Sequence, residues 1–180
     1  MSKTTAVREF EFIHSMSEVL SNTVDIAVNL KTNGFFTAPA STQYHGNYEG
    51  GLFDHSLQTM DELVGLSMRN RLTWIRPESP YIVGMFHDLC KMDAYKVDLG
   101  NPEGWTYADD LLIKGHGDKS VMILSTLMQL TEEEVLCIRY HMGAFTDKGE
   151  WNYHTRVIHK YPNILWTHHA DMLAAHVVGM

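Results

Sequence analysis

The sequence predicts a mainly α-helical protein with one small β-hairpin inserted at about residues 92–114. Apolar residues recur every three or four positions along most of the chain, which is the spacing of one helix face. Within 92–114 they alternate instead, on both sides of a turn at residues 101–104, as expected for two paired strands. The alternating residues are Tyr95, Val97, Leu99, Trp105 and Tyr107.

We expect seven helices, which cover about 10–30, 53–69, 79–91, 116–130, 131–141, 153–160 and 162–178. Pro80 suits the first turn of the third helix, and Pro162 suits the start of the last one. Thr131 with Glu134 forms a capping-box pattern that begins the fifth helix. Residues 31–51 are expected to form a long loop because glycines and a proline interrupt them. Long loops in compact domains are usually functional or mobile.

The bulk properties favour a single helical domain over residues 1–180. A chain of 180 residues with 44% hydrophobic content can bury a sizeable core. Its net charge of −8 comes without a basic stripe, so polymeric nucleic acid is an unlikely partner and a small anionic ligand is favoured. The oligomeric state stays open.

The sequence also predicts a cytoplasmic protein that does not enter a membrane. The amino terminus lacks the apolar core of a signal peptide. No apolar run approaches the roughly 18 residues needed to cross a bilayer. Cys90 and Cys137 lie far apart in apolar runs, which is typical of buried thiols in a reducing compartment.

Histidine and aspartate residues are distributed over the predicted helices in a pattern that favours a metal site. The chain has 11 histidines. Five predicted helices each carry one or two of the following residues: His55, His87, Asp88, His116, His141 and Asp171. An aspartate on an apolar helix face, as at Asp171, is usually paired or binds a metal. Imidazole and carboxylate ligands converging in a helical bundle suit Fe, Mn, Co, Ni or Zn, and the lack of thiolates argues against a structural zinc.

The order H…HD…H…H…D resembles the HD superfamily of metal-dependent phosphohydrolases. The segments YHGNYEGGLFDHS, FHDLCK, GHGDKS and IRYHMGAF resemble those of bacterial and phage HD-domain hydrolases, and the similarity covers Gln43 to Ala175. The resemblance implies a helical HD fold in which His55, His87, Asp88 and Asp171 hold a first divalent ion. In two-metal members Asp88 would bridge, and His116 and His141 would hold the second ion; otherwise these two histidines contact substrate.

Further residues are candidates for binding substrate around the metal. Lys91 matches the lysine of the HDxxK pattern and is the first choice for a phosphate contact or for helping the leaving group. The weaker candidates are Lys119, Arg139, His45, Tyr48 and His168. In-line attack on phosphorus needs cationic groups around the equatorial oxygens, which a lysine can supply.

The resemblance implies hydrolysis of a phosphoester or phosphoanhydride in a nucleotide or similar small phosphorylated compound, through metal-activated water. Three alternatives stay open. The same ligand set occurs in mixed-valent di-iron oxygenases, and ligands alone do not separate the two classes. The EGG…H loop also resembles the HD module of 3′–5′ exoribonucleases, which carry an extra domain. A non-catalytic sensor is disfavoured because all six ligands are present.

Overall fold

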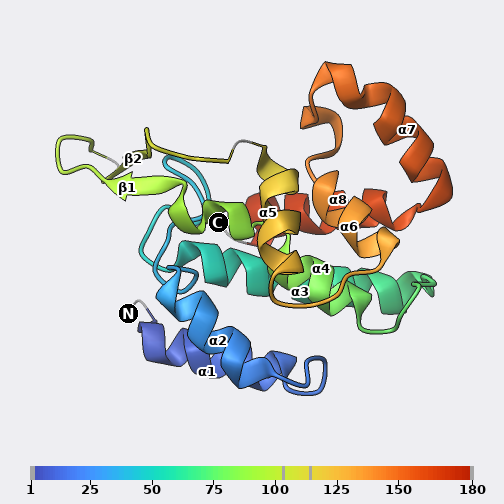
Figure 1. The fold of residues 1–180 in the computed structure, drawn as a ribbon, viewed down its shortest axis with the longest axis horizontal. Helices are drawn as coiled ribbons and strands as arrows, with labels where there is room; N and C mark the ends of the chain where they lie inside the picture. Colours follow the sequence, from blue (N-terminus) through green and yellow to red (C-terminus); the bar gives the residue numbers. More distant parts are fainter. Residues whose placement is uncertain (1–2, 103, 114, 179–180) are drawn as a thin grey trace.

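The computed structural model describes residues 3–102, 104–113 and 115–178, and it confirms a mainly α-helical fold with a small β-hairpin (Figure 1). Residues 103 and 114 of the predicted hairpin region lie outside the described part. The helices are α1 (Thr5–Met16), α2 (Thr23–Thr32), α3 (Gly51–Asn70), α4 (Ser79–Phe86), α5 (His116–Ser125), α6 (Glu132–Arg139), α7 (Trp151–Lys160) and α8 (Asn163–Leu173). The strands β1 (Tyr95–Val97) and β2 (Trp105–Tyr107) pair antiparallel, with Tyr95 opposite Tyr107.

Helix α3 is the centre of the arrangement. It packs most extensively against α4 and then against α8, while α1 and α2 cover its other side (Figure 1). The hairpin projects at one end of the molecule, and α7 lies at the opposite end. None of the described helices is both long and apolar enough to span a membrane.

A cluster of aromatic rings fixes the position of α3. Its members come from α1, the loop after α2, α3 and α4, and they are Phe12, Phe35, Phe36, Phe53 and Phe86. Neighbouring rings meet edge to face, with centroids 5.3 to 6.5 Å apart, which is a favourable geometry for aromatic pairs. Phe53 lies two residues before His55, and Phe86 lies directly before His87. This packing therefore also positions the two histidines.

The element boundaries differ from the predicted ones in several places, including the start of the first helix at Thr5 and the end of the helix predicted over 116–130 at Ser125. The expected helix at 10–30 is two helices, because the chain turns after Met16 and the hydroxyl of Thr23 donates to the carbonyls of Met16 and Leu20. The expected helix at 79–91 ends at Phe86 and is followed by a 3₁₀ turn at Leu89–Asp93. The last helix ends at Leu173 and continues as a π-helical turn, Ala174–Val178.

The predicted capping box at the start of α6 is confirmed. The hydroxyl of Thr131 accepts from the backbone N–H of Glu134, and the Glu134 carboxylate accepts from the backbone N–H of Thr131 at 2.8 Å. The same buried carboxylate accepts from Arg76 at 2.6 Å. The cap therefore ties α6 to the segment before α4 as well as beginning the helix.

Gly84 allows α4 to approach α3 closely, and we expect Gly84→Ala to destabilise the protein. An added methyl group would lie 2.4 Å from Met60 Cα, where only a backbone shift can make room. Overpacking of this kind costs about 1–3 kcal/mol of unfolding free energy. Urea unfolding measures it, with Gly65→Ala in α3 as the matched control: its methyl would meet only the flexible end of Arg69. Equal unfolding midpoints for Gly84→Ala and Gly65→Ala would contradict this close contact.

Candidate metal centre

All six predicted metal ligands meet at one buried centre. His55 lies in α3, His116 is the first residue of α5, and Asp171 lies in α8. His87 and Asp88 occupy the break between α4 and the 3₁₀ turn, and His141 follows the end of α6. His87, Asp88 and His141 are almost completely buried. Groups of these residues, together with Cys90, have ligand atoms close enough to hold a metal ion.

Four of the side chains form a first group around His55. Its Nε2 atom lies 3.1 Å from Asp171 Oδ1, 3.3 Å from His87 Nε2 and 3.6 Å from Asp88 Oδ2. His87 Nε2 lies 3.4 Å from Asp88 Oδ2. Ligand atoms that each sit about 2.1 Å from one ion are separated by roughly 3.0 to 3.4 Å in octahedral or tetrahedral geometry. His55, His87 and Asp88 have ligand atoms close enough to share one cation, and Asp171 forms a further such group with His87 and His141.

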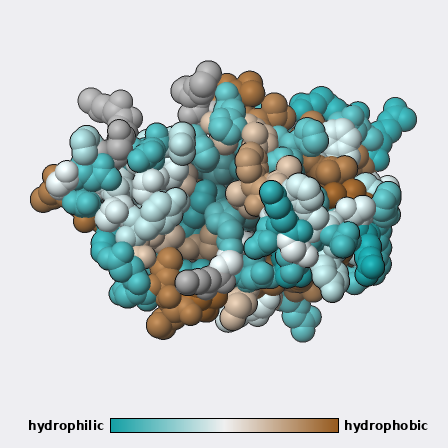
Figure 2. Space-filling view, turned by 90° about the horizontal axis from the view of Figure 1, so that it is seen from above, coloured by the Kyte–Doolittle hydropathy of each residue, from teal (hydrophilic) through white to brown (hydrophobic). Residues whose placement is uncertain are grey.

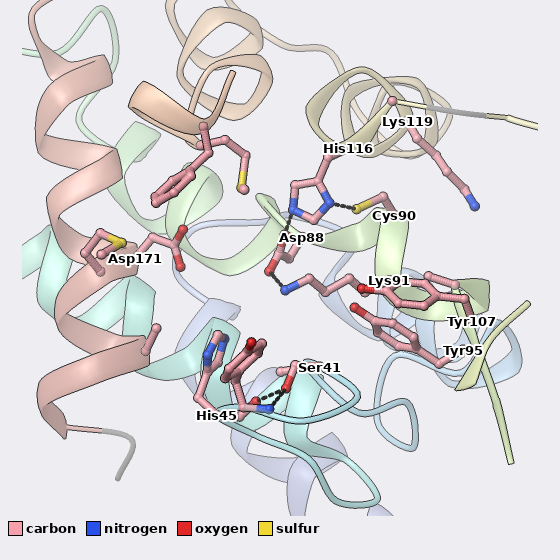
Figure 3. A pocket seen from close by; sticks show the side chains of 18 of the residues that line it. Ser41, His45, Asp88, Cys90, Lys91, Tyr95, Tyr107, His116, Lys119 and Asp171 are labelled. Carbon is pink, nitrogen blue, oxygen red and sulfur yellow. Dashed lines mark hydrogen bonds and ion pairs between the residues drawn. The ribbon is translucent and has the colours of Figure 1, made fainter. Parts of the chain in front are cut away.

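A second group faces the other oxygen of Asp88. Oδ1 lies 2.7 Å from His116 Nε2 and 3.4 Å from His141 Nε2 (Figure 3). Oδ1 is paired with His116, whereas His141 Nε2 makes no hydrogen bond to any described residue. Buried polar atoms without hydrogen bonds cost about 1–3 kcal/mol each. A cation between these atoms would remove that cost, so the donor set fits a metal here too.

Backbone carbonyls set the orientation of two of the histidines. Nδ1 of His87 lies 2.9 Å from the carbonyl of Gly84, and Nδ1 of His141 lies 2.7 Å from the carbonyl of Ile138. A carbonyl oxygen only accepts, so Nδ1 carries the hydrogen and donates it. In the neutral ring Nε2 then keeps its lone pair toward the centre, which is the usual arrangement of a metal-binding histidine.

The charges within the centre are strongly coupled. Burial opposes ionisation of Asp88, but Lys91, His87 and His116 outweigh it and hold its pKa well below the usual range. Burial likewise opposes protonation of His87 and His116. The Asp88 carboxylate outweighs this effect and raises the pKa of each imidazole to about 10; at His87 the Asp171 carboxylate acts in the same direction. Burial lowers the pKa of His55 and of His141. The centre thus holds ionised carboxylates whose countercharge is supplied by protons or by bound cations.

A cavity of about 560 Å³ opens onto this centre. Ser41, His45, Lys91, Tyr95 and Tyr107 line it, and in Figure 3 Lys91 and both tyrosine hydroxyls are directed toward Asp88. Figure 2, seen from above, shows hydrophilic side chains in the hollowed middle of this face. Among the described residues that line the cavity, the only carboxylates are Asp88 and Asp171 of the metal centre. A protein with a net charge of −8 therefore keeps its other acidic groups, as far as the structure describes them, out of this cavity.

Two of the predicted substrate contacts lie deep in the cavity. Lys91 Nζ lies 2.7 Å from Asp88 Oδ2. The ring of His45 lies 4.6 Å from the ring of His55, and both nitrogens of His45 are buried with no hydrogen-bond partner in the described part of the chain. Desolvation, followed by the positive fields of His55 and Lys91, lowers the pKa of His45 to about 4. His45 is therefore a neutral ring that can still donate one hydrogen bond and accept another.

The other predicted contacts are less directly placed. Lys119 and His168 line the cavity, but Lys119 forms an ion pair with Asp93 and His168 Nδ1 lies 2.8 Å from the carbonyl of His141. Tyr48 does not line it; this side chain borders a smaller cavity behind His55. Arg139 does not line it either, because its guanidinium is held by Asp118 at 2.7 Å and by Glu150 at 3.3 Å.

Two residues at the centre were not among the predicted site residues. Cys90 is buried as predicted, but its Sγ atom lies 3.2 Å from His116 Nδ1. Its position between Asp88 and Lys91 is the only sequence feature that points to the site. His176 lines the cavity, and its ring centroid lies 6.1 Å from that of His45. It reaches the cavity because the chain continues as a π-helical turn after α8.

Comparisons with protein-family models, with characterised proteins and with solved structures found no match for this chain.

Proposed function

We propose that this chain is a metal-dependent phosphohydrolase of the HD type, which cleaves a phosphoester or phosphoanhydride bond in a nucleotide or a similar small phosphorylated compound. One observation carries the proposal. Asp88 directs its two oxygens at two separate sets of histidine Nε2 atoms, at the inner end of a cavity with no other carboxylates except Asp171 among its described residues. This arrangement suits bound cations on one side and an anionic substrate on the other.

The ligand chemistry favours transition metals. Imidazole nitrogens mixed with carboxylate oxygens suit Fe, Mn, Co, Ni or Zn, in one or two sites. His55, His87, Asp88 and Asp171 would hold the first ion, and Asp88, His116 and His141 the second. Bound cations would supply Lewis-acid charge to a phosphoryl oxygen and to the attacking water.

The chain's own residues would bind and orient the phosphoryl group. Lys91 remains a cation in the cavity because, although burial lowers its pKa, the Asp88 carboxylate more than offsets this and raises it. We assign Lys91 to a phosphoryl oxygen, where a fixed positive charge is most effective in the transition state. His45, neutral and without a hydrogen-bond partner in the described structure, is assigned to a polar group of the substrate near the first ion.

Aromatic side chains at the cavity favour a substrate with a planar ring. Tyr44, Tyr107 and Phe145 line the cavity from three different segments and expose 76%, 63% and 71% of their surface. Aromatic rings left in water around a binding cavity are well suited to stack on a nucleobase, which contributes about 1–3 kcal/mol per base. Nucleotides are therefore preferred over sugar phosphates as substrates.

The test combines elemental analysis with a substrate panel. Protein purified without added metal is expected to contain one or two transition-metal ions per chain. It should release inorganic phosphate from nucleotides faster than from sugar phosphates, equally with and without oxygen. Turnover that consumes oxygen and releases no phosphate would instead identify an oxygenase. Release of mononucleotides from oligonucleotides, without release of inorganic phosphate, would identify an exonuclease-like phosphodiesterase.

A further inference from the structure

The histidines whose Nε2 atoms face Asp88 differ in the hydrogen-bond partner of their other ring nitrogen, Nδ1. His87 and His141 each donate from Nδ1 to the carbonyl of the residue three positions earlier, Gly84 and Ile138. His116 has no preceding helical turn to supply such a carbonyl, because it is the first residue of α5. Its Nδ1 atom instead lies 3.2 Å from Cys90 Sγ (Figure 3).

Two additional hydrogen bonds set where this sulfur lies. The backbone N–H of Cys90 donates to Ser120 Oγ at 3.0 Å, and Ser120 Oγ donates to the carbonyl of His116 at 3.3 Å. The 3₁₀ turn that contains Cys90 also packs against α5. The sulfur and the imidazole are therefore held next to each other by contacts other than their own.

We propose that Cys90 is a positioning residue, whose sulfur accepts the Nδ1 hydrogen of His116 and so keeps His116 Nε2 available as a ligand of the second cation. This inference rests on the two-cation form of the proposed function. The second observation behind it is the buried His141 Nε2 atom, which makes no hydrogen bond to a described residue and, like His116 Nε2, faces Asp88 Oδ1.

The ring nitrogen that Cys90 contacts distinguishes this role from that of a direct ligand, which the spacing of Asp88, Cys90 and His116 would also allow. Cys90 contacts Nδ1, whereas the atom that faces Asp88 is Nε2, on the other side of the imidazole ring. An ion held by Nε2 and by Asp88 Oδ1 therefore has the ring between itself and the sulfur. If the thiol donated to Nδ1 instead, the neutral ring would carry its hydrogen on Nε2 and lose the lone pair that binds metal.

The experiment titrates metal-free protein with Co²⁺ and counts bound ions by calorimetry and elemental analysis. The variants are Cys90→Ala, Cys90→Ser and, as matched control, Cys137→Ala, which alters the other buried cysteine within α6. Wild type and Cys137→Ala should bind two ions. In Cys90→Ala we expect the first affinity to stay unchanged and the second to fall about 10- to 100-fold, the usual effect of losing an outer partner of a metal ligand. Cys90→Ser should lie between wild type and Cys90→Ala, because its hydroxyl can still accept.

Four outcomes would overturn the inference. They are unchanged second affinity in Cys90→Ala, a sulfur-to-cobalt charge-transfer band in wild type that Cys90→Ala removes, a wild type that binds only one ion, and an equal loss of both ions in Cys90→Ala. If Cys90→Ala does not fold, as judged by circular dichroism, Cys90→Ser decides by the same comparison of the two affinities. Phosphate release is measured separately. Its absence in a wild type with two ions would refute the proposed function and leave the role of Cys90 intact.

Discussion

Replacing Asp88 by asparagine is expected to lower phosphate release by at least a thousandfold and to reduce bound metal to less than one ion per chain. Asparagine keeps the shape of the side chain, but it loses the charge and replaces one carboxylate oxygen by a nitrogen that does not bind metal. Asp88 is the residue common to both ligand groups, so both sites are affected. A bound cation supplies several kcal/mol of transition-state stabilisation, and about 1.4 kcal/mol corresponds to a factor of ten in rate.

The matched control for this variant is Asp109→Asn. Asp109 follows β2, is exposed, and pairs with the exposed Lys96. It loses the same charge without touching the metal centre, so metal content should be unchanged and the rate should stay within about twofold, as is usual for an exposed ion pair. An Asp88→Asn protein that keeps its full metal content and its rate would refute the site assignment.

Removing the metal is expected to lower the melting temperature by about 10 °C. Without a cation, the buried His141 Nε2 makes no hydrogen bond to the described residues, and two ionised or ionisable groups crowd Asp88 Oδ1 without a metal to neutralise them. An ion present at 1,000 times its Kd stabilises the folded state by about 4 kcal/mol, and each kcal/mol shifts the melting temperature of a chain of this size by roughly 2–4 °C. Thermal melts followed by circular dichroism, in chelator and in saturating Mn²⁺, measure the difference.

The same melts on Asp88→Asn provide the control for metal binding elsewhere. Its melting temperature should be nearly the same in chelator and in Mn²⁺, because the shared ligand is missing. Superimposed melts of the wild type in the two conditions would show that the buried centre does not bind Mn²⁺. A shift of equal size in Asp88→Asn would place the bound ion at another part of the molecule.

Features that depend on neighbours in the chain could be predicted from the sequence. The hairpin around Tyr95 and Tyr107 and the capping box at Thr131 and Glu134 were predicted correctly, since each depends on residues within a few positions of one another or on one turn. The six candidate ligands were also proposed from the sequence, through its resemblance to the HD pattern. The structure brings all six together, because α6 and α8 pack against α4 or α3, while α5 packs against α6 and the 3₁₀ turn after Asp88.

Features that depend on distant contacts could not be predicted. The contacts of Arg139 and Tyr48 depend on other segments of the chain. Arg139 pairs with Asp118 and Glu150, and Tyr48 borders the smaller cavity behind His55. The turn after Met16 could not be predicted either. It interrupts a continuous apolar pattern, and hydrophobic spacing does not indicate where a helix ends so that two helices can pack.

The sequence by itself determined the helical class and the local caps and turns, and it indicated six His and Asp side chains as candidate metal ligands. Only the tertiary structure decided which oxygen of Asp88 faces which imidazole, and that Cys90 lies against His116. The physical reason is distance along the chain. Helix periods and caps arise from interactions over three or four residues, whereas the position of a ligand atom depends on the packing of α3, α4, α5 and α8 together, fixed to within a few tenths of an ångström.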